Sequence, residues 1–186
     1  GLYREKLDAK QKANALSDKQ FAGIDLDDLA PTEKTTGTEP LLKGIFAGLL
    51  EKGCKVEGFD AYVTSNVIGG AGVSSSASFE MLVCVIVDYL FNEGKIDVVT
   101  YAKAGQYAEN VYWLKASGLM DQLACAVGGP ILLDFSDREN PKYEKVNFSF
   151  HDYDHHLVIV NTGKGHADLS EEYSEIPMEM KEAAKA

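Results

Sequence analysis

Apolar residues recur every three to four positions along four stretches of this chain, and this period predicts four helices. The first is EPLLKGIFAGLLEKG (39–53), which ends at a glycine, and the second is FEMLVCVIVDYLF (79–91). The third covers 98–112, with Asp97 as its N-cap, and the fourth covers 119–129, again ending in glycine.

Strands are expected where apolar and polar residues alternate, or where a short apolar run stands alone. The segment GFDAYVTSNV (58–67) alternates and predicts a half-buried strand. Three further strands are expected in PILLDF (130–135), KVNFSF (145–150) and HLVIVNT (156–162). Because helices and strands are intermingled along the chain, the pattern predicts one mixed α/β domain.

Both ends of the chain are polar and carry weaker patterns. The first 38 residues predict a short helix near Lys6–Asp18, followed by a loop. The C-terminal segment 166–186 is helix-prone, but we expect Pro177 to break it.

The composition narrows the possible classes of function. The chain has 186 residues, of which 45% are hydrophobic, enough for one domain with its own core. Its net charge of −11 argues against nucleic-acid binding, which usually needs a basic surface. No signal peptide is visible, and Asp88 interrupts the longest apolar run, so no membrane span is expected.

The cysteines and histidines give no catalytic pattern of their own. The three cysteines are odd in number and far apart, and Cys84 and Cys125 fall in apolar helical patterns that predict buried thiols in a reducing, cytoplasmic setting. The cluster HDYDHH (151–156) lacks the spacing of a metal site, so we interpret it as a solvated turn.

The segment GGAGVSSSAS (69–78) supplies more glycine and serine than a turn and a helix cap need. A helix N-terminus attracts anions, and glycines before it let a phosphate approach the backbone. Serine hydroxyls add hydrogen-bond donors and a possible ligand for magnesium. The simpler alternative is a turn with one N-cap serine. The segment is neither a Walker A loop, since no GKS or GKT follows, nor a complete GxGxxG fingerprint.

Two carboxylates downstream strengthen the phosphate interpretation. Glu109 lies near the end of one predicted helix, and Asp121 lies in the first turn of the next. During phosphoryl transfer, Asp121 could take a hydroxyl proton and Glu109 could help to hold Mg²⁺. Taken singly, Asp121 could merely complement its helix dipole and Glu109 could be a solvated side chain.

These motifs together resemble a known family. GGAGVSSSAS (69–78) resembles the phosphate-binding motif of the GHMP superfamily, which includes galactokinase and the homoserine, mevalonate and phosphomevalonate kinases. GQYAEN (105–110) and SGLMDQ (117–122) are similar to the galactokinase branch, in which an AE(N/H) element lies upstream of CGxMDQ. The order of motifs over Thr38–Lys181, with VIVNT and SEEY near its end, also follows that branch.

The resemblance implies a role for each matching residue. The residues implied to surround the ATP phosphates are Gly70, Gly72, Ser74, Ser75 and Ser76. Ser76 would ligate Mg²⁺, with Ser75 as the alternative, and Glu109 would be the second magnesium partner. Asp121 would contact the sugar and accept or orient the proton of its anomeric hydroxyl, and Tyr173 would contact galactose.

The resemblance also implies a fold, a mixed α/β (α+β) GHMP-kinase N-terminal domain of the ribosomal protein S5 domain 2-like type, incomplete at both ends here. Residues 39–168 would form this ATP-binding domain, and the polar segment 1–38 would belong to it. Residues 169–186 would be the helical start of a connection to a missing C-terminal domain.

The chain departs from the galactokinase pattern in several places. It has no counterpart of the early motif GRVNLIGEHxDY, whose arginine assists catalysis, and Ser117 stands where CGxMDQ has cysteine. After SEEY it reads SEIPMEMKE, where the family usually has an arginine-containing helix. Because phosphoryl transfer needs its developing charge stabilised, we expect the 186-residue chain alone to be inactive.

The function implied by the resemblance is transfer of the ATP γ-phosphoryl group to the anomeric hydroxyl of galactose, in the cytoplasm. Another acceptor, such as N-acetylgalactosamine, remains open, and so does a non-catalytic sensor that binds galactose and ATP. The expected partners are these small molecules and the remaining parts of the same kinase, with no nucleic acid and no membrane.

Overall fold

The computed structural model describes residues 23–67, 69–70, 72–160 and 170–185, with side chains of the last range described from Glu175 onward. Its centre consists of four α-helices: α2 (Thr38–Glu51), α3 (Ser75–Phe91), α4 (Val98–Tyr107) and α5 (Met120–Val127). Helix α4 continues directly into a π-helix, η1 (Ala108–Tyr112).

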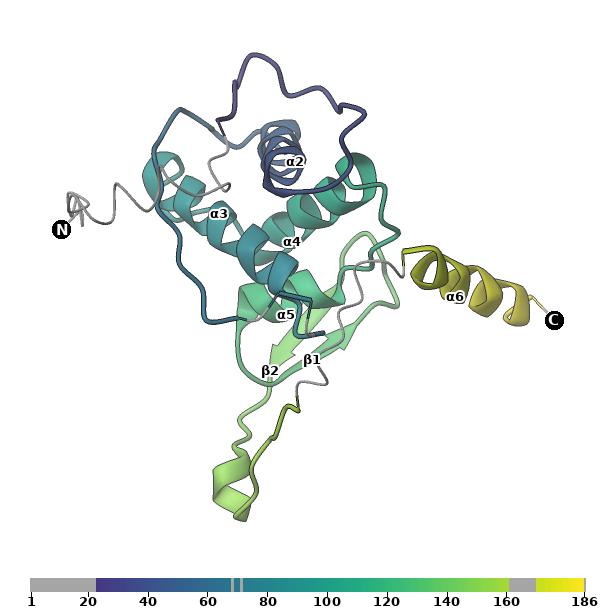
Figure 1. The fold of residues 1–186 in the computed structure, drawn as a ribbon. Coiled ribbons are helices and arrows are strands. Elements are labelled where there is room, and N and C mark those ends of the chain that lie inside the picture. The colour runs from purple at the N-terminus through teal and green to yellow at the C-terminus, as the bar shows by residue number, and fades with distance from the viewer. Residues whose placement is uncertain (1–22, 68, 71, 161–169, 186) are drawn as a thin grey trace.

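A small sheet and two further helices follow. Strands β1 (Ile131–Asp134) and β2 (Lys142–Lys145) pair antiparallel, with Ile131 opposite Lys145. The short 3-10 helix η2 (Phe150–Tyr153) comes next, and helix α6 (Ser170–Ala183) lies apart from the central helices in Figure 1. The helices and the small sheet confirm the prediction of a mixed α+β fold.

The core lies where the helices cross. Helix α2 packs on α4 and η1, while α3 packs on both α4 and α5. The buried residues of the main cluster are Leu41, Ile45, Phe46, Leu49, Met81, Val83, Cys84, Val87, Tyr101, Ala104 and Ala108. A second cluster of Ala102, Leu119 and Leu123 joins α4 to α5. Each fully buried Leu or Ile contributes about 1.5–3 kcal/mol to folding, so this packing holds the four helices together.

Two aspartates fix the connection from α3 to α4. Asp97 is the N-cap that the sequence predicts, because its side chain accepts hydrogen bonds from the backbone N–H groups of Val99 and Thr100, both at 3.0 Å. Asp88 is buried and accepts the N–H of Lys95 at 2.9 Å. The direction in which α4 leaves α3 is therefore set by side-chain hydrogen bonds as well as by packing.

The predicted helices are found and most of the predicted strands are not. Strand β1 lies within 130–135, but residues 58–67 and 146–160 form no strand. A strand is stable only when its backbone groups pair with a neighbour, and the described residues offer these segments none. The apolar side chains of 157–160 accordingly remain 65–77% exposed.

Pro177 does not break the C-terminal helix. Helix α6 runs through it to Ala183, so that expectation is wrong. A proline removes one backbone hydrogen bond at a cost of about 3 kcal/mol, and the surrounding Glu, Met and Lys residues have high helix propensities that offset part of this. The segment Lys6–Asp18 lies outside the described residues.

The prediction of buried thiols is confirmed for one of the two cysteines. Cys84 is buried, and burial raises the pKa of its thiol, whereas Cys125 is only half-buried. The turn predicted at 151–156 is an exposed 3-10 turn. In the part of the chain that the structure describes, no helix is long and apolar enough to span a membrane.

Candidate active site

The glycine-rich segment leads into the N-terminus of α3, as predicted. Gly70 and Gly72 both have φ of 71°, a left-handed backbone conformation that favours glycine. Ser74 is also left-handed, with φ 55° and ψ 44°, which is uncommon for a residue with a side chain. Its hydroxyl does not cap its own helix, so Ser74 is not an ordinary N-cap serine.

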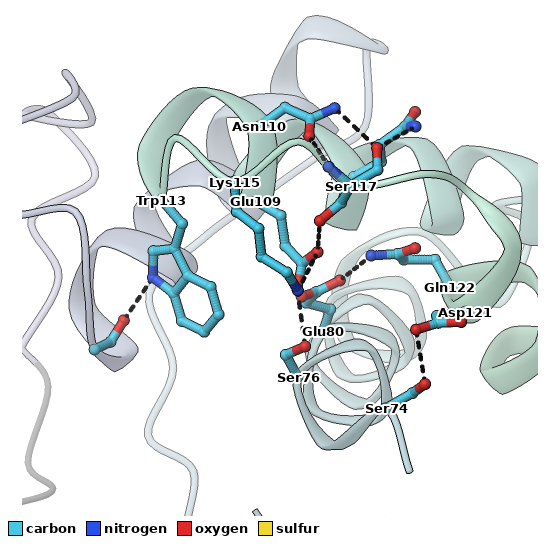
Figure 2. A network of polar contacts seen from close by, with 12 residues as sticks. Ser74, Ser76, Glu80, Glu109, Asn110, Trp113, Lys115, Ser117, Asp121 and Gln122 are labelled. Atoms are coloured by element: carbon cyan, nitrogen blue, oxygen red, sulfur yellow. Dashed lines mark hydrogen bonds and ion pairs between the residues drawn. The ribbon is translucent and has the colours of Figure 1, made fainter. Parts of the chain in front are cut away.

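The Ser74 hydroxyl instead donates a hydrogen bond to Asp121, over 2.7 Å to Oδ2. Asp121 lies in the first turn of α5 and is exposed, so a substrate can reach its carboxylate. Figure 2 shows the two side chains meeting between the ends of α3 and α5. The N-termini of two helices therefore converge here, and both favour negative charge.

Glu109 lies in the π-helix η1, and its side chain is only 2% exposed. The interpretation of Glu109 as a solvated side chain is therefore wrong. Its carboxylate accepts the hydroxyl of Ser76 at 2.8 Å on Oε1, and also the hydroxyl of Ser117 on Oε2. Lys115 Nζ lies 3.0 Å from Oε1 and 3.1 Å from Oε2 (Figure 2). Isolated π-helical turns are often found at functional sites.

The surroundings of Glu109 favour its ionised form. Burial alone would raise the pKa of this carboxyl group, but the hydroxyl of Ser117, the ammonium of Lys115 and the hydroxyl of Ser76 together lower it. A buried carboxylate that stays ionised beside a hydroxyl is suited to a hard divalent cation. The structure thus brings together the two residues predicted to hold Mg²⁺, Ser76 and Glu109.

Two side chains bond Glu109 in the structure without being predicted from the sequence to do so, Lys115 and Ser117. Lys115 falls in the loop between η1 and α5, which reads only as a break between helices. A single basic residue between two acidic motif elements is the signal that could have indicated it. Ser117 stands where the family has cysteine, and its hydroxyl bonds Glu109 while its backbone N–H donates to Asn110 at 2.7 Å.

A second acidic side chain, Glu80, lies buried beneath the site and is also missed by the sequence analysis. It is fully buried in α3 and accepts a hydrogen bond from Gln122 Nε2 at 3.1 Å. Burial, together with the nearby charge of Glu109, raises the pKa of Glu80 to about 8. A carboxylate on the same helix face as the buried Val83 and Val87 is the signal that could have found it.

The raised pKa of Glu80 predicts a specific dependence of stability on pH. Between its ordinary value of 4.5 and about 8, the folded state binds a proton that the unfolded state has lost. The free energy of unfolding should therefore fall with rising pH, by up to about 1.4 kcal/mol per unit from this group. Glu80→Gln should remove this contribution, so the variant should gain stability relative to wild type from pH 5 to 8.

The measurement is chemical denaturation of both proteins at each pH, in the absence of nucleotide and metal. Taking the difference between the two proteins removes the titration of all other groups. A stability difference that is constant across this range would contradict the prediction. Glu57→Gln, at an exposed position, is the control and should give a constant difference.

Ser75 and Tyr173 are the two remaining residues to which the resemblance assigns a role. No side-chain hydrogen bond of Ser75 is found among the described residues, although Ser75 begins α3. The side chain of Tyr173 lies outside the described residues, so its predicted sugar contact stays a prediction. Among the described residues, no group of three or more His, Cys, Asp or Glu side chains could hold a metal ion.

The arrangement offers several of the groups that phosphoryl-transfer sites use, although the chain has no counterpart of the arginine-bearing motif. It offers a glycine-rich approach to a helix N-terminus, a hydroxyl–carboxylate pair for a cation, and a separate exposed carboxylate beside them. The two carboxylates differ in environment, since Glu109 is buried and held by donors whereas Asp121 is open to solvent. This difference suits Glu109 to binding a cation and Asp121 to handling a proton.

Comparisons with known proteins identify a family match and several relatives of the chain. Residues 40–129 match the family described as the GHMP kinases N terminal domain. Galactokinase from Clostridium tetani is 34% identical over 188 residues, which cover 100% of this chain and 46% of that protein. Galactokinase from Lactococcus lactis is also 34% identical, with the same coverage. Galactokinase from Clostridium perfringens is 37% identical over 153 residues, covering 81% of this chain and 38% of that protein.

No solved structure gives a match. The chain spans about half or less of the length of these curated relatives. The family match includes the glycine-rich segment, Glu109 and Asp121, which are the residues that meet in the structure. Residues 40–129 therefore belong to the GHMP kinase N-terminal domain family, and the chain is similar to galactokinases over its whole length.

Proposed function

We propose that the protein carrying this chain is a sugar kinase that transfers the γ-phosphoryl group of ATP to the anomeric hydroxyl of galactose. The observation that carries the proposal is the pair of contacts that tie the serine-rich turn to two distant carboxylates. Ser74 bonds Asp121 at 2.7 Å and Ser76 bonds Glu109 at 2.8 Å. A structural turn has no need of either contact, whereas a site that binds a nucleoside triphosphate with its cation needs a hydroxyl and a carboxylate for the ion and a carboxylate for the acceptor proton.

In this proposal, the backbone from Gly70 to Ser76 and the first turn of α3 bind the phosphates of ATP. Ser76 and Glu109 hold Mg²⁺, and their hydroxyl and carboxylate oxygens are the ligand type that this ion prefers. The ion would offset negative charge on the phosphates. Lys115 pairs with Glu109 in the structure, on the same carboxylate that Ser76 contacts, and in this proposal its ammonium supplies a second positive charge at the phosphates.

Asp121 handles the proton of the acceptor. As the sugar oxygen forms its bond to the γ-phosphorus, the bond from that phosphorus to the β,γ-bridging oxygen breaks and ADP leaves. The hydroxyl proton passes to, or is oriented by, the Asp121 carboxylate. Ser74 fixes one oxygen of this carboxylate, so the other is directed toward substrate. Tyr173 is the proposed sugar contact.

The proposal places the enzyme in the cytoplasm, which the three free cysteines support. Two alternatives differ from it in testable ways. A kinase for N-acetylgalactosamine would share the phosphate chemistry and differ only in its sugar contacts. A sensor would bind galactose and ATP without transferring phosphate, although a sensor has no need of an exposed Asp121.

A coupled assay of ADP release tests the proposal on the protein that carries this chain, with galactose, N-acetylgalactosamine and glucose as acceptors. We expect MgATP-dependent turnover that is highest with galactose. Turnover only with N-acetylgalactosamine would favour that alternative, and binding of both ligands without ADP release would favour the sensor. The 186-residue chain assayed alone should show no robust turnover.

A further inference from the structure

Two polar side chains are buried directly beneath the candidate site and are used by none of the chemistry above. Glu80 of α3 is 0% exposed and Gln122 of α5 is 1% exposed. Gln122 Nε2 donates to Glu80 Oε2 at 3.1 Å (Figure 2). The Oε1 atom of Gln122 has no hydrogen-bond partner among the described residues, and the Glu80 carboxyl group has the Glu109 carboxylate as its other polar neighbour. Incompletely paired polar groups in a core are unfavourable compared with apolar side chains, so packing alone does not explain this pair.

The position of the pair in the two helices suggests what it does. Glu80 follows Ser76 by four residues, so both lie on the same face of α3, one turn apart. Gln122 directly follows Asp121 in the first turn of α5. The hydrogen bond between Glu80 and Gln122 therefore joins the turn that carries the phosphate-binding serines to the turn that carries Asp121.

Helix α4 closes tightly over this hydrogen bond at Gly105. A Cβ atom at Gly105 would lie 2.5 Å from Glu80 Oε2, 3.0 Å from Met81 Cε and 3.2 Å from Gln122 Cγ. Only glycine leaves room for the pair in its present arrangement. Three helices thus meet at one hydrogen bond, and a change in the relative position of α3 and α5 would have to break it.

We infer that the Glu80–Gln122 hydrogen bond positions Asp121 relative to the phosphate-binding turn of α3. The inference rests on the proposed function, because it assigns the pair to the geometry of that site. Neither side chain touches substrate, so both are positioning residues. Proton transfer and in-line attack depend steeply on distance, and a displacement of about 1 Å can lower turnover about 10²-fold.

The first test compares Gln122→Met with Glu80→Gln in the protein that carries this chain. Gln122→Met removes the hydrogen bond at similar volume and should lower kcat about 10-fold or more, with KM for ATP changed less than about threefold. Glu80→Gln keeps an acceptor for Gln122 and should retain kcat within about threefold. A kcat of Gln122→Met within twofold of wild type, per folded molecule, would overturn the inference.

Leu49→Ala is the matched control, because Leu49 is fully buried in α2, a helix that carries neither residue of the pair. It should lower the melting temperature without lowering kcat of the folded protein. If Leu49→Ala lowers kcat as much as Gln122→Met does, general loss of stability explains the effect and the inference fails.

A second readout does not depend on turnover with any sugar. Hydrogen–deuterium exchange should be faster over residues 119–123 in Gln122→Met than in Leu49→Ala at equal global stability. Equal exchange in the two variants would overturn the positioning role. If the wild-type protein phosphorylates no sugar, the proposed function fails, while the exchange result still decides whether the hydrogen bond holds α5 in place.

Discussion

Replacing Asp121 by Asn is expected to lower turnover about 10²–10⁴-fold, the usual contribution of a positioned acid or base. Asn has nearly the same shape as Asp and can still accept the Ser74 hydroxyl, which now lies 2.7 Å from Asp121 Oδ2. The fold and the affinity for ATP should therefore be preserved, because the Asp121 side chain is exposed. The measurements are kcat in the ADP-release assay and the dissociation constant for MgATP by calorimetry.

Asp60→Asn is the matched control, since Asp60 is exposed and lies in the segment between α2 and the glycine-rich turn. It should leave kcat unchanged. Unchanged turnover in Asp121→Asn would refute the assignment of the proton-handling role. A loss of ATP affinity equal to the loss of kcat would instead place Asp121 in nucleotide binding.

The helical part of the fold follows from the sequence because its signals are local. The period of apolar residues in α2 and α3 is uninterrupted, and Asp97 caps α4 with its own side chain. Such signals need no information from distant residues. The π-helix η1 has no comparable signal, since its sequence AENVY is compatible with a continuing α-helix.

The strands could not be predicted in the same way. Alternation along 58–67 and the apolar run at 157–160 show that these segments can be strands, but a strand exists only with a partner. Among the described residues, only the segments 131–134 and 142–145 pair as strands. Strand β2 (Lys142–Lys145) is exposed along its whole length and overlaps the strand predicted at 145–150 only at Lys145, so the apolar pattern does not mark it.

The candidate site was partly visible in the sequence. The serine-rich turn, Glu109 and Asp121 stand out because each combines an unusual residue type with a helix end, and the structure brings them together. Lys115 and Glu80 do not stand out, because a lysine in a loop and a glutamate in a helix are ordinary in sequence. Their importance comes from burial and from contact with Glu109 and Gln122, which only the three-dimensional arrangement supplies.

Replacing Glu109 by Gln is expected to lower turnover about 10²–10³-fold, the usual loss when one charge-stabilising group is removed from an active site. The Mg²⁺ concentration for half-maximal turnover should rise at least about 10-fold, because a neutral amide binds this ion more weakly than a carboxylate. The change also leaves the ammonium of Lys115 without its present partner, 3.0 Å away. The readouts are a Mg²⁺ titration of kcat and the binding of Mn²⁺ in the presence of ATP, followed by electron paramagnetic resonance.

Glu57→Gln provides a matched control for Glu109→Gln, because Glu57 also pairs with a lysine, Lys55 at 2.7 Å, but both partners are exposed. Its Mg²⁺ dependence should equal that of wild type, since exposed ion pairs contribute little. A Lys115→Met variant separates the two functions of the Glu109 carboxylate. If Glu109 acts through the metal, Lys115→Met should retain Mn²⁺ binding while Glu109→Gln loses it. If both variants bind Mn²⁺ as wild type does, the carboxylate serves only to anchor Lys115, and the metal role of Glu109 is refuted.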